Sequence, residues 1–141
     1  MAWPWMRRAT AQGAAEDAGG SSRAITGRTG EALAERYLQK RGLRILERNY
    51  RVARGRSRHG GEIDLVALDT DGTLVFVEVR VRRGDMGGGA AASVDPAKQA
   101  RLVYAARTYL ADLSRVPPCR FDVVALDGDR VQWLKAAFDA D

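Results

Sequence analysis

Cysteine and histidine are almost absent from this sequence of 141 residues. The chain has one cysteine, Cys119, and one histidine, His59. A single cysteine excludes an intramolecular disulfide and a cysteine-based zinc site. A catalytic thiol at Cys119 would need a histidine partner, and His59 lies in a stretch rich in arginine and glycine. Thiol catalysis is therefore not expected.

Long hydrophobic runs are also missing. No stretch of about 18 apolar residues occurs, so the sequence predicts no membrane span. The first residues carry their positive charges after the apolar part, and no long apolar stretch follows, so they do not resemble a secretion signal. The sequence therefore predicts a cytoplasmic protein with no membrane partner.

Negative charge is scarce in one part of the chain. Lys and Arg total 23 against 18 Asp and Glu, a net charge of +5, and residues 23–59 hold eleven of the basic residues but only three acids. This cluster includes Arg54, Arg56 and Arg58 in a stretch that reads as a flexible loop. Two interpretations remain open: a solvated arginine-rich surface, or a rim that contacts the phosphates of a nucleic acid.

Hydrophobic periodicity and turn residues predict one domain over residues 27–141, preceded by a disordered tail at 1–26 that is rich in Ala, Gly and Ser. A first helix is expected at 29–41, with Leu33, Ala34, Tyr37 and Leu38 at helical spacing. A second begins at Asp95-Pro96, where Asp caps the helix and Pro fits its first turn. Strands are expected at 43–52, 61–68, 74–82, 120–126 and 130–134. The order αβββαββ indicates a mixed α/β layer domain.

Two carboxylates stand out when the strands 61–68 and 74–82 are folded into a hairpin about Asp71. The apolar residues then match, Leu68 with Leu74 and Val66 with Phe76, and Asp64 falls opposite Glu78. Two neighbouring carboxylates repel each other and favour protonation of one. A divalent cation between them reverses the effect, and Mg²⁺ commonly uses one or two carboxylates with water and phosphate. The alternative is an exposed hairpin end with scattered charges, and a shift of one residue would separate the pair.

Several short motifs, in order from about residue 27 to 138, resemble the bacterial YraN family. They are Gly27 to Ala34, Gly42 with Ile45 to Arg51, GEIDLV at 61–66, FVEVRVR at 76–82, SVDPAKQ at 93–99, RFDVV at 120–124 and Ala137-Phe138. That family is similar to the PD-(D/E)XK nuclease superfamily, and within it to archaeal Holliday-junction resolvases. The resemblance implies a restriction-endonuclease-like αβββαβ core, with a mixed central sheet flanked by helices.

The same resemblance implies roles for individual residues. Asp64 and Glu78 match the acids that ligate Mg²⁺ or Mn²⁺, and Glu31 matches an acid of the first helix that acts through a metal-bound water. Lys98 and Gln99 match a pair at the start of the second helix, where backbone N–H groups favour phosphate.

One position departs from the nuclease pattern. Arg80 stands where the motif usually has lysine; arginine can stabilise a phosphate but cannot realistically lose a proton. Lys98 could reach the site instead, and Arg80 could simply pair with Glu62 across the strands.

Three functional hypotheses follow. The chain could be a metal-dependent nuclease for DNA, including branched or structured DNA. It could be a non-catalytic nucleic-acid-binding module that keeps the fold, or an interaction protein with a vestigial acidic pair, which the intact Asp64 and Glu78 disfavour. Symmetric cutting of two strands would favour a homodimer.

Overall fold

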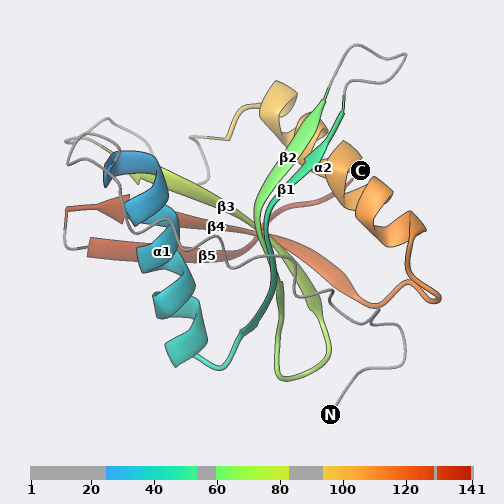
Figure 1. Ribbon diagram of the computed structural model, residues 1–141, viewed down its shortest axis with the longest axis horizontal. Coiled ribbons are helices and arrows are strands. Elements are labelled where there is room, and N and C mark those ends of the chain that lie inside the picture. The colour runs from blue at the N-terminus through green and yellow to red at the C-terminus, as the bar shows by residue number, and fades with distance from the viewer. Residues whose placement is uncertain (1–24, 54–59, 83–93, 129, 141) are drawn as a thin grey trace.

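The computed structural model describes residues 25–53, 60–82, 94–128 and 130–140 (Figure 1). The predicted tail, except for its last two residues, lies outside these ranges. So do most of the predicted basic loop, with Arg54, Arg56 and Arg58, and all of residues 83–92, a glycine-rich segment before the second helix. The first helix begins at Ile25, four residues before the predicted start, so the end of the predicted tail is helical.

Two helices and five strands follow the predicted order. They are α1 (Ile25–Lys40), β1 (Arg44–Val52), β2 (Gly61–Leu68), β3 (Leu74–Arg82), α2 (Pro96–Ala111), β4 (Cys119–Asp127) and β5 (Arg130–Phe138). The strands form one sheet in sequential order; β3 and β4 are parallel, and the other neighbours are antiparallel. α2 connects the parallel pair. The predicted restriction-endonuclease-like core, with a mixed sheet and flanking helices, is confirmed.

The hydrophobic core consists of two clusters, one on each face of the sheet. Alternate residues of β2, β3 and β4 point to opposite faces, so Phe76 belongs to the cluster under α2 and Val77 to the cluster under α1. Figure 1 shows the two helices packed on different sides of the sheet. Strands that are covered on both faces are continuously apolar, which explains the runs of Val, Leu and Phe in the sequence.

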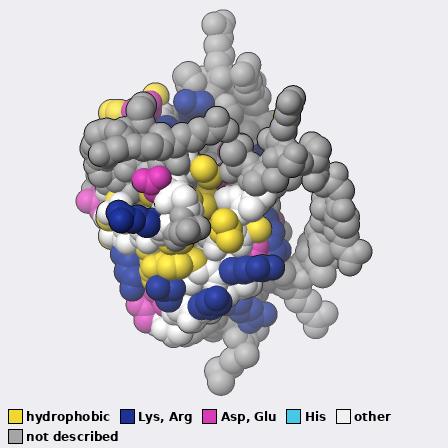
Figure 2. All heavy atoms as spheres, turned by 90° about the vertical axis from the view of Figure 1, so that its left-hand side faces the viewer, with side chains coloured by type: hydrophobic (Ala, Val, Ile, Leu, Met, Phe, Trp, Pro, Cys, Tyr) yellow, Lys and Arg dark blue, Asp and Glu magenta, His cyan; other side chains and the backbone are white. Residues whose placement is uncertain are grey.

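The buried face of α1 is narrower than its apolar sequence pattern indicated. Ala34 and Leu38 are fully buried and Tyr37 is half-buried, whereas Leu33 is 47% exposed. Val81, near the end of β3, is also exposed. Hydrophobic side chains are visible among Lys and Arg in Figure 2, which views the molecule from the left-hand side of Figure 1, where α1 and the ends of β3 and β4 lie.

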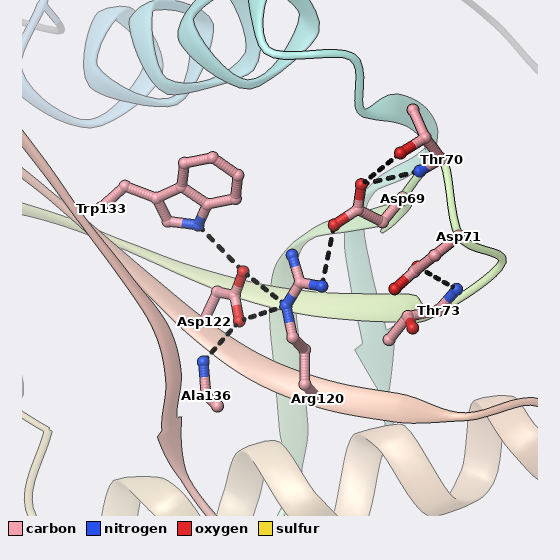
Figure 3. A network of polar contacts seen from close by, with 8 residues as sticks. All are labelled: Asp69, Thr70, Asp71, Thr73, Arg120, Asp122, Trp133 and Ala136. Atoms are coloured by element: carbon pink, nitrogen blue, oxygen red, sulfur yellow. Dashed lines mark hydrogen bonds and ion pairs between the residues drawn. The ribbon is translucent and has the colours of Figure 1, made fainter.

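Strand β5 is four residues longer than predicted, and its partner β4 shows why. The register between the two strands shifts between Phe121 and Val123, and Ala136 has a φ of 50°. The N–H of Ala136 donates to the carboxylate of Asp122 at 2.9 Å, so a side chain satisfies the backbone at this bulge (Figure 3). Pairing then resumes at Phe138. A bulge of this kind leaves no clear period in the sequence.

Candidate active site between β2, β3 and α2

The β2–β3 hairpin has the predicted register only over its apolar part. Leu68 pairs with Leu74, and the ladder continues to Leu65 and Val77. It ends there, so the prediction that Asp64 and Glu78 are direct cross-strand partners is wrong. On its other edge β3 pairs with β4 along its whole length, and there Glu78 lies beside Val123.

Asp64 takes part in the junction where β2 and β3 separate. Its Oδ2 accepts a hydrogen bond from the backbone N–H of Val79 at 2.8 Å. A carboxylate oxygen thus satisfies a donor that no longer has a backbone acceptor on the neighbouring strand. This bond also fixes the orientation of the Asp64 side chain beside Glu78.

The two carboxylates line the same cavity, of about 160 Å³, between the sheet and α2. Its lining residues are Glu62, Asp64, Glu78, Lys98, Arg101 and Leu102. Glu78 is 4% exposed and Asp64 is half-buried, so the acids lie at the margin of the core and not at an exposed hairpin end.

Burial and the neighbouring acids both raise the pKa of Asp64. Burial raises the pKa of Asp64 to about 7, with further contributions from the neighbouring charges of Glu78, Glu31 and Glu62, while the hydrogen bond from Val79 acts in the opposite direction. The pair is therefore costly to keep fully ionised unless a positive charge lies close to it.

That positive charge comes from α2. Lys98 Nζ lies 2.7 Å from Glu78 Oε1, whereas Arg80 Nη1 lies 3.9 Å from the same oxygen. Lys98 is placed by the start of the helix, where the side chain of Asp95 accepts a hydrogen bond from the Lys98 N–H at 2.8 Å. A lysine from α2 thus lies beside Glu78, and it comes closer to this carboxylate than Arg80 does. Glu62, the alternative partner considered for Arg80, forms an ion pair with Arg51 at 3.4 Å.

Glu31 approaches this acidic group from α1. Burial raises the pKa of Glu31, a hydrogen bond with Asn49 lowers it, and the charges of Glu62 and Glu78 raise it further. Gly30 lets the helix come close, since a Cβ there would lie 2.5 Å from a methyl carbon of Val81. Asn49 holds a left-handed conformation, with a φ of 52°, between the β1 residues that pair with Ile63 and Leu65. The structure therefore brings Glu31 into electrostatic range of Asp64 and Glu78.

Gln99 does not line the cavity. Its Nε2 donates to the carbonyl oxygen of Val94 at 2.9 Å, which holds the chain at the start of α2. Its contact with phosphate stays a prediction, as do those of Arg54, Arg56 and Arg58.

The donor set fits a hard divalent cation such as Mg²⁺ or Mn²⁺. Carboxylate oxygens are the ligands that these ions prefer, and two can suffice when water and phosphate complete the shell. Asp64 and Glu78 would hold the ion. Within the described ranges no group of three or more Asp, Glu, His or Cys side chains is arranged to hold a metal.

Sequence reasoning missed Glu62 and Arg101 as lining residues, and Asn49 as the partner of Glu31. Arg101 follows Lys98 by three residues, a spacing that places both on one face of a helix, so this signal was present. The contact between Asn49 and Glu31 joins β1 to α1 and leaves no trace in local sequence.

These features define a restriction-endonuclease-like α/β domain with an acidic pair and a lysine in one cavity. The chain belongs to UPF0102, described as an uncharacterised protein family, whose model matches residues 30–126. The family resemblance seen in the sequence is thereby confirmed. In the part of the chain that the structure describes, no helix is long and apolar enough to cross a membrane.

Relatives of similar length share this family name. The UPF0102 protein Mpe_A3766 of Methylibium petroleiphilum is 60% identical over 111 residues, covering 79% of this chain and 91% of that protein. The UPF0102 protein RALTA_A3032 of Cupriavidus taiwanensis is 59% identical over 120 residues, covering 85% and 87%. Among solved structures, the crystal structure of SSO0001 has a TM-score of 0.48 at 16% identity, covering 85% of this chain and 55% of that one, a similarity too weak to carry an argument.

Proposed function

We propose that this protein is a metal-dependent nuclease acting on DNA, including branched or otherwise structured DNA. One observation carries the proposal: Asp64, Glu78 and Lys98 meet in a single cavity although they come from two strands and a helix. Two acids can hold a metal ion that activates water and stabilises phosphoryl oxygens, and a lysine beside them can transfer a proton.

In the proposed reaction, a water oxygen bonds to phosphorus and one phosphorus–oxygen bond of the DNA backbone breaks. The water loses a proton, and the departing oxygen gains one. A bound Mg²⁺ or Mn²⁺ would neutralise charge on the phosphoryl oxygens and acidify the attacking water. Asp64, fixed by the Val79 N–H, and Glu78 would hold that ion.

Lys98 and Arg80 would have different roles in the reaction. Both approach Glu78, but only lysine can realistically take up and release a proton. Lys98 can therefore move a proton or orient the water, whereas Arg80 can only stabilise the negative charge that develops on the phosphate. Glu31, further from the pair, would act on water rather than on the ion.

The same ion pair also favours a second candidate, a nucleic-acid-binding module without catalysis. With Lys98 at 2.7 Å, Glu78 is already neutralised without a metal. A chain that had lost the chemistry could keep the fold and its basic surface in this form. Cleavage and binding must therefore be measured separately.

The test is the cleavage of labelled four-way-junction, flap, duplex and single-stranded DNA in Mg²⁺, Mn²⁺ or EDTA. The native protein is compared with Glu78→Gln and with the control Glu62→Gln, which changes an exposed acid of the same cavity. We expect cutting only with metal, its loss in Glu78→Gln, and activity near native in Glu62→Gln.

Binding without cutting in every metal would overturn the nuclease proposal and support the second candidate. Cutting that persists in EDTA or in Glu78→Gln would also refute the assigned site.

A further inference from the structure

Among the described residues that line the cavity, Arg101 is the basic residue that is left without a carboxylate partner. Glu78 pairs with Lys98, Glu62 pairs with Arg51, and Asp64 accepts from the backbone of Val79. Arg101 has no side-chain ion pair or hydrogen bond among the described residues, although three acids share its cavity.

The backbone of Arg101 also lies close to β2, against Gly61. A Cβ added to Gly61 would lie 2.6 Å from the carbonyl oxygen of Arg101 and 2.8 Å from the Cβ of Ala105. Only glycine permits this contact, so the position of Arg101 is fixed against the strand that carries Asp64, three residues further on. The backbone of Arg101 is therefore held in place, although the Arg101 side chain is exposed.

We propose that Arg101 binds a backbone phosphate of the nucleic acid at the cavity that Asp64 and Glu78 line. A guanidinium presents paired N–H donors that match two phosphate oxygens, and phosphate is the oxyanion that a DNA ligand would bring to this place. The inference rests on the proposed function only for the identity of the ligand, and it holds for a binding module as well as for an enzyme.

Binding is measured by fluorescence anisotropy with labelled duplex and four-way-junction DNA in EDTA, over a series of salt concentrations. The variants are Arg101→Ala, Arg101→Lys and the control Arg107→Ala, which removes the same charge from an exposed position of the same helix outside the cavity. Thermal melting of each variant verifies that it is folded.

Arg101→Ala should bind DNA about tenfold more weakly, as expected for loss of a charge-assisted pair, and the slope of log K against log salt should become shallower by about 1. Arg101→Lys should keep the salt slope but recover only part of the affinity, because lysine lacks the paired donors. Arg107→Ala should stay near native on both measures.

The proposal is overturned if Arg101→Ala and Arg107→Ala have the same effect, or if the native protein binds neither DNA. Native cleavage in Mg²⁺ is recorded in parallel. If Arg101→Ala binds DNA as tightly as Arg107→Ala while the native protein cleaves DNA, only the role of Arg101 is refuted. If DNA binding depends on Arg101 but the native protein does not cleave DNA, only the nuclease proposal is refuted.

Discussion

Asp122 and Asp64 are both carboxylates within the central sheet, but their surroundings differ. Asp122 is fully buried on the α1 side and accepts hydrogen bonds from Arg120 Nε, Trp133 Nε1 and the Ala136 N–H, at 2.9–3.2 Å (Figure 3). Arg120 in turn pairs with Asp69 at 2.8 Å. Asp64, on the α2 side, accepts one backbone N–H and faces other acids.

This difference distinguishes a structural acid, Asp122, from Asp64, the acid of the proposed site. The Asp122 network brings donors from β4 and β5 to one buried charge, as stability requires. The Asp64 cavity keeps like charges together at a cost in stability, and a cost of this kind is typical of sites that bind a cation or substrate. Four predictions test or sharpen the comparison.

Replacing Asp122 by Ala should cause the largest loss of stability. It would leave the Trp133 Nε1–H and the Ala136 N–H without an acceptor and remove the partner of Arg120, at a cost of about 3–5 kcal/mol. Urea unfolding of the variant measures the loss, with Asp127→Ala, an exposed acid at the end of β4, as the control. A loss below about 1 kcal/mol would mean that the network is not what holds β5 in place.

Replacing Lys98 should instead reduce activity. If the proposed function holds, Lys98→Ala should lower kcat by about 100-fold, the effect of losing a group that transfers a proton. Arg80→Ala should have a smaller effect, because its guanidinium lies further from Glu78. Single-turnover cleavage with saturating metal measures both. A larger loss of kcat in Arg80→Ala than in Lys98→Ala would mean that Arg80 on β3, and not Lys98 on α2, is the basic residue that the reaction depends on.

Asp64→Asn should stabilise the protein in EDTA above neutral pH. Burial raises the pKa of Asp64 in the folded state from its ordinary value of 3.8 to about 7, so between these values the folded state binds more protons than the unfolded state. Native stability contributed by this group therefore falls as pH rises from about 4 through 7. The asparagine removes this penalty and can still accept the Val79 N–H.

The expected gain is about 2 kcal/mol at pH 8 and close to zero at pH 4, since one unit of pKa corresponds to about 1.4 kcal/mol and partial exposure reduces the effect. Urea unfolding of both proteins across this pH range measures it. A constant difference, or one that shrinks as pH rises, would contradict the raised pKa.

Trp133→Phe should give the smallest effect. It removes one donor of Asp122 and keeps most of the ring, which also packs edge-on against Tyr37. We expect a loss of about 1–2 kcal/mol in urea unfolding, with cleavage unchanged. A change in DNA cleavage without a loss of stability would mean that the Asp122 network acts on the Asp64 cavity, and would contradict the distinction between them.

The fold was largely predictable, because its signals are local. Alternation and apolar runs placed β2 and β3 at their observed ends, and Asp95-Pro96 marked the start of α2. The end of β5 was not predictable, since it depends on the bulge at which Ala136 bonds to Asp122.

The candidate site was predictable only in part. Family motifs identified Asp64, Glu78, Glu31 and Lys98, but the pairing of the first two through the ladder was wrong, because Asp64 bonds to the backbone of Val79 where the strands part. Arg101 lies at the cavity because α2 packs closely against Gly61, and no local sequence pattern predicts such a tertiary contact.

Direct measurement of Mn²⁺ binding tests the central claim, that Asp64 and Glu78 together form a metal site. Calorimetric titration of the native protein, Asp64→Asn, Glu78→Gln and Glu62→Gln at pH 8 would compare the four without requiring DNA or catalysis. We predict one site in the native protein and in Glu62→Gln, and its loss in Asp64→Asn and in Glu78→Gln. Equal Mn²⁺ affinity in all four proteins, or none in the native protein, would contradict the account.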